Sequence, residues 1–138
     1  MAIRIVRLGS PRAPGEGLRL GTVRRPPRGV EKSQLAARDF YDVWMPEAAP
    51  SEALLKATRS SGFGGHGRQT GDDPAAWMTF VRRYRAEMKR PEASRLLDLL
   101  AALSHRTNLA VGCYCADEAR CHRSVLRALL EERGADLG

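Results

Sequence analysis

Hydrophobic and polar residues alternate along several segments of the chain, and the period of the alternation predicts which segments are strands. Residues 3–8 (IRIVRL) alternate with a period of two, as a half-buried strand does. Residues 18–23 (LRLGTV) predict a second strand, and the aromatic-rich residues 40–44 (FYDVW) predict a third. Residues 107–113 (TNLAVGC) are mostly apolar, which predicts a strand buried on both faces.

Apolar residues at helical spacing predict the helices. Ser51 is a good N-cap for a short helix, and Pro74 and Pro91 each suit the first turn of a longer one. Helices are expected over 30–37, 51–58, 74–88, 91–103 and 121–133. The order of helix, buried strand, short loop and helix near the C-terminus predicts an α/β fold, a single small three-layer domain with a mostly parallel sheet flanked by helices.

The length of 138 residues suits one domain, residues 1–138, built around a single core. Within it, residues 60–73 (SSGFGGHGRQTGDD) predict a flexible glycine-rich loop. These letters contain a G-x-G-x-x-G pattern, but a dinucleotide-binding loop follows a strand and opens a helix directly, whereas this segment follows a helix. We interpret it as a lid or a linker.

The composition excludes several classes of protein. With 43% hydrophobic and 28% charged residues, the chain is globular rather than disordered. No apolar run approaches the roughly 20 residues of a membrane span, and residues 1–10 do not resemble a signal peptide. Three cysteines are too few for a disulfide framework. We therefore expect a cytoplasmic protein with no membrane partner.

The net charge of +7 lies in the first quarter of the chain. Residues 1–38 hold nine basic and two acidic side chains, and the remaining residues are neutral overall. This excess allows a nucleic-acid-binding module as an alternative function, since several phosphate contacts need such charge. Within the segment, Arg24, Arg25 and Arg28 are held by two consecutive prolines and are candidate anion-binding residues.

Reactive side chains concentrate in residues 112–124 (GCYCADEARCHRS). In an open α/β sheet, ligands bind where parallel strands end and helices begin, and this segment joins the predicted last strand to the last helix. The positive end of that helix favours a thiolate or a bound anion. Cys115 and Cys121 are therefore candidate nucleophiles or redox thiols, His122 a candidate acid/base and Arg123 a candidate anion-binding residue.

Two other interpretations of the cysteine segment remain open. The cysteines can be small buried residues with a satisfied core histidine beside them. Alternatively, Cys113 and Cys115, on one face of a strand, can join Cys121 and His122 as a Cys₃His metal site. The spacing differs from that of the usual zinc motifs, which have two to four residues between paired ligands. We predict no metal ligand and no cofactor, and keep a metal-binding thiol module as an alternative function.

The motifs together resemble a known family. Their order is Arg24-x-x-Pro27-Arg28-Gly29, Pro50-Ser51-x-x-Leu54, Trp77-x-x-Phe80-x-x-x-Tyr84, then Cys115 and Cys121-His122-Arg123. This order resembles the YeaO-like branch of the domain-of-unknown-function-488 family and covers nearly the whole chain. The resemblance implies a small bacterial cytosolic α/β domain in a family with no settled activity. It also implies that a Cys-His-Arg segment and a strand-end cysteine, here Cys115, belong to the family pattern.

The chain also departs from that branch. Residues 23–29 (VRRPPRG) stand where much of the branch has an Asp-Arg-Leu-Trp-Pro-Arg-Gly stretch, so the acid and the tryptophan are absent. Some members lack the cysteines and keep a histidine at the place of His122, which makes histidine and arginine the more general part of the site.

The hypothesis from sequence is a small cytosolic protein with an anion-accepting Cys/His/Arg site at a strand-to-helix junction. A small anionic ligand or substrate is the expected partner, and nucleic acid is the less favoured one. The pattern leaves open whether the protein is an enzyme and which oligomeric state it has.

Overall fold

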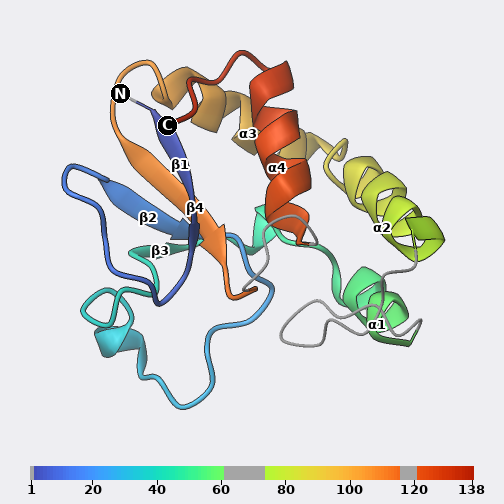
Figure 1. The fold of residues 1–138 in the computed structure, drawn as a ribbon, viewed down its shortest axis with the longest axis horizontal. Coiled ribbons are helices and arrows are strands. Elements are labelled where there is room, and N and C mark those ends of the chain that lie inside the picture. The colour runs from blue at the N-terminus through green and yellow to red at the C-terminus, as the bar shows by residue number, and fades with distance from the viewer. Residues whose placement is uncertain (1, 61–73, 116–120) are drawn as a thin grey trace.

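One parallel sheet forms the centre of the molecule. The computed structural model describes residues 2–60, 74–115 and 121–138 (Figure 1). Its four strands lie in the order β1-β4-β2-β3, and every neighbouring pair is parallel. The strands are β1 (Ile3–Arg7), β2 (Leu18–Gly21), β3 (Val43–Trp44) and β4 (Leu109–Cys113). The predicted α/β fold with a mostly parallel sheet is confirmed.

The described helices follow the predicted ones closely, with one exception. They are α1 (Glu52–Ser60), α2 (Pro74–Glu87), α3 (Pro91–Leu103) and α4 (His122–Glu132), with 3₁₀ helices η1 (Lys32–Gln34) and η2 (Pro46–Ala48). The helix expected over 30–37 is only the single turn η1. The chain turns directly after it, because Asp39 adopts a left-handed φ of 62° and the amide of Phe40 donates back to the carbonyl of Leu35.

The strand predicted over 40–44 is also shorter than expected, because two of its residues have other partners. The ring of Tyr41 packs against Gly21, where a Cβ atom would lie 2.4 Å from the ring. The Asp42 carboxylate accepts a hydrogen bond from the backbone amide of Arg19 at 2.8 Å. Val43 and Trp44 pair in register with Leu20 and Gly21 of β2, and the backbone amide of Asp42 donates to the Arg19 carbonyl just before them.

The central strand β4 is buried along its whole length, as predicted. It pairs with β1 on one side and β2 on the other, so that Val111 lies opposite both Ile5 and Leu20. The residues that directly follow β1 and β2 are hydrogen-bonded to the end of β4. The amide of Leu8 donates to the Cys113 carbonyl, and the amide of Thr22 donates to the Gly112 carbonyl. The carboxyl ends of three strand segments therefore meet at one edge.

The helices lie on one side of the sheet and bury the main core against it (Figure 1). Ser51 caps α1 as predicted, since its Oγ accepts the amide of Leu54 at 3.1 Å. The predicted apolar stripe of α2 includes Phe80, Tyr84 and Met88, which are all buried. The leucine stripe of α3 is only partly internal, because Leu99 and Leu103 are exposed.

A second, smaller core lies at the carboxyl end of the strands. It joins the ends of β1 and β4 to the segment that follows β2, and it contains all three cysteines. Its buried members are Leu8, Val23, Leu35, Tyr41, Cys113, Cys115 and Cys121.

Residues 61–73 of the predicted glycine-rich loop lie outside the described residues, whereas its first residue, Ser60, is the last residue of α1. No helix in the described ranges has both the length and the apolar composition to cross a membrane. The two chain ends meet beside β1, where Leu137 forms a parallel bridge to Ile3 (Figure 1).

Candidate thiol site

The candidate site lies where β4 ends and α4 begins. Cys113 is the last residue of β4, and Cys121 is the N-cap of α4 with an extended backbone (φ −127°, ψ 154°). The Cys121 carbonyl accepts the amide and the hydroxyl of Ser124, both at 3.0 Å, which begins the helix. The predicted strand-to-helix junction is confirmed as the place where these thiols lie.

Cys113 and Cys121 are in direct contact. Their Sγ atoms lie 2.7 Å apart, closer than an ordinary contact of two sulfurs and longer than the roughly 2.05 Å of a disulfide bond. Both side chains are buried, with exposed fractions of 0% and 2%, and none of the three cysteines forms a disulfide. Cys115 is also buried and belongs to the same small core.

His122 is oriented by a backbone carbonyl. Its Nε2 lies 2.8 Å from the Thr22 carbonyl oxygen, so Nε2 carries the proton and donates it there. The lone pair of Nδ1 is then free, and Nδ1 lies 3.7 Å from the Cys121 Sγ. The edge of the Tyr84 ring packs on the imidazole with the two ring centroids 5.5 Å apart. Nδ1 is therefore the imidazole nitrogen placed to accept a proton from Cys121.

The three thiols differ in acidity because of these contacts. Burial alone would raise the pKa of Cys121, but hydrogen bonds from Cys113 and Cys115 and the neighbouring His122 lower it well below that of a free thiol. Burial raises the pKa of Cys113 far above the ordinary value. A hydrogen bond with Cys113 lowers the pKa of Cys115, but one with Cys121, together with burial, raises it to about 12. The directions of these shifts make Cys121 the most acidic of the three thiols.

Arg123 supplies a buried positive charge beside the sulfurs. It is only 3% exposed, and one terminal nitrogen donates to the Cys115 carbonyl. Burial by itself would lower the pKa of Arg123, but the nearby sulfurs of Cys113 and Cys121 raise it. Its Nε has no hydrogen-bond partner within the described residues. A buried donor without a partner is uncommon in proteins. Arg123 lies beside the sulfur cluster, which comprises Cys113, Cys115 and Cys121.

Comparison with family models identifies the chain. A model described as the active DUF488-N3 subclade (DUF488-N3a) matches residues 3–134. The chain belongs to the DUF488 family. This match confirms the family resemblance found in the sequence; the YeaO-like branch stays a prediction. No curated protein matched the chain, and no solved structure did.

The arginines predicted as an anion clamp have other partners in this DUF488 chain. Arg24 donates to the carbonyls of Pro50 and Ala49, at 3.1 and 3.2 Å. Arg25 pairs with Glu52 on the surface, and Arg28 is exposed. No described contact joins these arginines to the sulfur cluster. Of the four arginines predicted to bind an anion, Arg123 is therefore the one that the described contacts place beside the cysteines.

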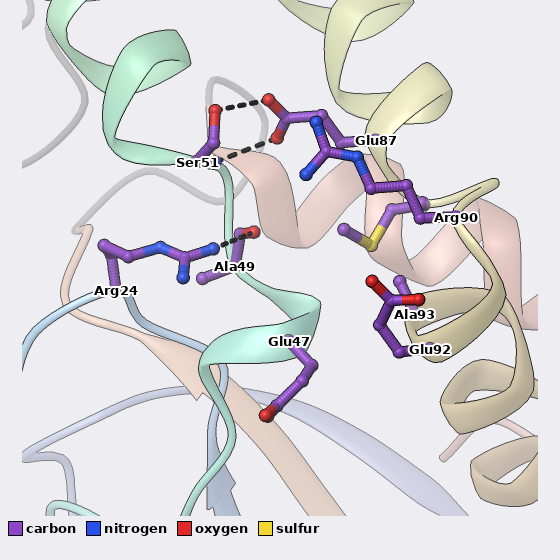
Figure 2. A pocket seen from close by; sticks show the side chains of 9 residues that line it. Arg24, Glu47, Ala49, Ser51, Glu87, Arg90, Glu92 and Ala93 are labelled. Atoms are coloured by element: carbon purple, nitrogen blue, oxygen red, sulfur yellow. Dashed lines mark hydrogen bonds between the residues drawn. The ribbon is translucent and has the colours of Figure 1, made fainter.

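Arg24 lines a different hollow, of about 180 Å³, beside the start of α3 (Figure 2). Positive and negative side chains alternate around it: Arg24 and Arg90 lie with Glu47, Glu87 and Glu92. Glu87 accepts hydrogen bonds from the backbone amide and the hydroxyl of Ser51 (Figure 2). Because both positive and negative side chains line this hollow, its charge favours neither an anionic nor a cationic ligand.

The sulfur cluster also offers ligand atoms for a metal ion. One atom each from Cys113, Cys121 and His122 lies within 4.8 Å of the others, and all three residues are buried. Two thiolates and an imidazole nitrogen suit a soft or borderline cation such as Zn²⁺ or Cu⁺. The Nδ1 lone pair of His122 would be the nitrogen ligand, because Nε2 is used by Thr22.

Sequence reasoning placed Cys115, Cys121, His122 and Arg123 at this junction and missed two neighbours. Thr22 was not considered, although it lies at the predicted strand end and its carbonyl orients the histidine. Tyr84 was assigned only to the core of α2, yet it touches the imidazole. The position of Thr22 at a parallel strand end was the signal available for finding it.

Proposed function

We propose that this DUF488 protein is a thiol-dependent module whose working group is the Cys121 thiolate. One observation carries the proposal: the Cys121 Sγ lies 3.7 Å from the only unprotonated nitrogen of His122, whose other nitrogen is fixed on the Thr22 carbonyl. A thiol paired with an oriented imidazole is the arrangement of activated cysteine nucleophiles. The N-cap position at α4 stabilises the same thiolate.

Arg123 suggests the kind of molecule that would react. The Nε–H of Arg123 has no partner among residues 2–60, 74–115 and 121–138, and it is a donor for a polar or anionic atom of the substrate. Because Cys121 is 2% exposed, the reacting molecule must be small. We infer a small polar or anionic electrophile, with His122 as the acid/base group. Three thiols outside any disulfide fit the reducing environment of the cytoplasm.

The experiment is the pH dependence of iodoacetamide alkylation, followed at each cysteine by peptide mapping. Cys121 should react as a thiolate at and below neutral pH, while Cys113 and Cys115 react only when the pH is high or the protein is unfolded. The His122→Gln variant should move the Cys121 profile toward the ordinary thiol pKa of about 8.5. If Cys121 in the native protein titrated like an ordinary thiol, the proposal would fail.

A metal-binding thiol module is the second candidate function, and the clustered ligand atoms of Cys113, Cys121 and His122 favour it. Its test is elemental analysis of protein purified without chelator, together with the absorption spectrum after adding Co²⁺. A sulfur-to-cobalt charge-transfer band that disappears in Cys113→Ser would support it. Protein without metal and without that band would exclude it.

The nucleic-acid alternative has less support from the described contacts. Several of the N-terminal basic residues are already engaged: Arg12 pairs with Asp42, Arg19 with Glu16 and Arg25 with Glu52. A DNA-binding titration across a salt series tests this alternative, since several phosphate contacts give a steep loss of affinity with salt.

A further inference from the structure

We propose that Cys113 and Cys121 form a redox couple, in which a small hydroperoxide oxidises Cys121 and Cys113 closes a disulfide with it. This inference rests on the proposed function, because it needs Cys121 to be the reactive thiolate. It adds a substrate class, the hydroperoxides, and gives a role to Cys113, which was not among the candidate nucleophiles.

The geometry of the two sulfurs carries the inference. The Sγ atoms lie 2.7 Å apart, so a shift of less than about 1 Å brings them to the roughly 2.05 Å of a disulfide bond. Both residues are held by regular structure: Cys113 pairs with Arg7 of β1 in the sheet, and Cys121 caps α4. The contact between the two sulfurs is therefore fixed by the sheet and by the start of α4.

The surroundings give the two sulfurs different roles. Cys121 has His122 beside it and begins a helix, so it is the sulfur that attacks. The hydrogen bond described for the Cys113 sulfur is to Cys121 and not to a basic side chain, and Cys113 is fully buried, which keeps it a thiol until a neighbouring sulfur is oxidised. An attacking thiolate beside a waiting thiol is the pattern of cysteines that sense or reduce peroxides.

In the first step, the Cys121 thiolate attacks one oxygen of the hydroperoxide. The S–O bond forms and the O–O bond breaks, so that sulfur is oxidised to a sulfenic acid and the leaving oxygen is reduced. That oxygen takes the proton held by the His122 imidazolium and departs as water or an alcohol. The Nε–H of Arg123, which has no partner in the described part of the chain, is a donor for the charge that develops on this oxygen.

In the second step, the Cys113 sulfur attacks the Cys121 sulfur. The S–S bond forms, the S–O bond breaks, and the hydroxyl leaves as water with the proton of the Cys113 thiol. A dithiol reductant returns the pair to two thiols by thiol–disulfide exchange and is itself oxidised to a disulfide.

Burial decides which oxidant fits. Cys121 is 2% exposed and Cys113 is 0% exposed, so the disulfide of another protein has no path to either sulfur in this conformation. Hydrogen peroxide is small and uncharged and can be hydrogen-bonded by Arg123. We therefore assign the oxidant to the small hydroperoxides.

The test is to treat the full-length, chelator-washed protein with hydrogen peroxide and map its peptides without reduction. Trypsin cuts after Arg120, which separates residues 107–120 from 121–123, so a bond between Cys113 and Cys121 links two peptides. We expect the linked peptide to appear, and free thiols to fall from three to one per chain. Dithiothreitol should restore all three.

Cys115 supplies the matched control, because it is a neighbouring buried thiol outside the strand pairing. In Cys115→Ser the linked peptide should still form, because Cys113 is then the only cysteine of residues 107–120. In Cys113→Ser it should be lost, and dimedone should trap a sulfenic acid on Cys121. If Cys113→Ser does not fold, fragment ions of the linked peptide from the unchanged protein decide the matter, because residues 107–120 contain both Cys113 and Cys115 and only the fragments show which of them is bonded.

The inference is overturned if peroxide yields no linked peptide, if Cys115 rather than Cys113 is bonded to Cys121, or if a bound metal ion holds both sulfurs and prevents oxidation. Alkylation of Cys121 at neutral pH separates these failures from failure of the proposed function. A Cys121 that is alkylated as a thiolate but forms no disulfide would leave the proposed function intact and remove only the redox couple.

Discussion

His122 Nε2 lies 2.8 Å from the Thr22 carbonyl oxygen, a contact that joins residues 100 positions apart. It links the end of β2 to the first turn of α4, and so it fixes which imidazole nitrogen faces Cys121. The hydroxyl of Thr22 also donates to the Gly112 carbonyl at 2.9 Å, which ties the same point to β4. The orientation of the candidate base thus depends on the pairing of two strands.

The two roles of His122 can be separated by substitution. Glutamine can place an amide N–H near the position of Nε2 and keep the bond to Thr22, whereas alanine loses the bond and leaves a cavity beside Tyr84. We expect His122→Ala to lower the free energy of unfolding by about 2–4 kcal/mol and His122→Gln by less. Urea denaturation of both variants measures this difference. Equal losses would contradict the assigned bond.

The buried ion pair of Arg19 and Glu16 should be important for stability. Arg19 is 0% exposed, contacts both carboxylate oxygens at 2.8 and 2.9 Å, and also donates to the carbonyls of Ser10 and Asp39. Arg19→Met leaves a buried carboxylate without its partner, and should cost about 3–5 kcal/mol in the free energy of unfolding.

The matched control is the surface pair of Arg25 and Glu52. The Arg25 side chain is 78% exposed, so Arg25→Met should leave the free energy of unfolding close to that of the unchanged protein. The two variants are compared by urea denaturation at neutral pH. Similar losses in both would mean that the Arg19 pair contributes no more than a surface contact.

Acid should weaken the fold through Glu16. Burial alone would raise the pKa of Glu16, but the hydrogen bonds from Arg19 lower it below the ordinary value. A carboxyl whose pKa is lower in the folded than in the unfolded state stabilises the fold above the unfolded pKa, about 4.3. That stability is lost as the pH falls through the folded pKa. Urea midpoints measured downward from pH 5 should fall less steeply in Glu16→Gln, and an identical slope would contradict this account.

Gly17 should tolerate no side chain. Its φ is +83°, and a Cβ atom there would lie 1.9 Å from the Asn108 carbonyl oxygen. Gly29 also has a positive φ, +75°, but has open space around it. Gly29→Ala should therefore cost about 1 kcal/mol, from backbone strain alone, whereas Gly17→Ala should cost several times more. Thermal denaturation of the two variants compares them.

Much of the fold could be predicted because its signals are local. The apolar run of β4, the Ser51 cap and the apolar stripe of α2 follow from residues close in sequence. The error at η1 has a local cause, the left-handed turn at Asp39. The error at β3 has long-range causes, since Tyr41 packs against Gly21 and Asp42 binds the amide of Arg19. A single sequence does not show which distant residue will take such a partner.

The candidate site also has some features that follow from neighbouring residues in the sequence and others that depend on distant ones. Cys121, His122 and Arg123 are consecutive, so a strand-to-helix junction was enough to place them. The contact of Cys121 with Cys113 depends on how the chain returns from β4 into α4, and Arg24 binds carbonyls of a segment 25 and 26 residues away. These relationships arise only from tertiary packing.

The measurement that tests the central claim most directly is an ultraviolet titration of thiolate absorbance, comparing the unchanged protein with Cys121→Ser. The account predicts one thiolate per chain at neutral pH in the unchanged protein, lost only at a pH well below the ordinary thiol pKa of about 8.5, and no thiolate in the variant. Absorbance that appears only near pH 8.5 or above, and that is the same at neutral pH in both proteins, would contradict the claim that Cys121 is the working thiolate.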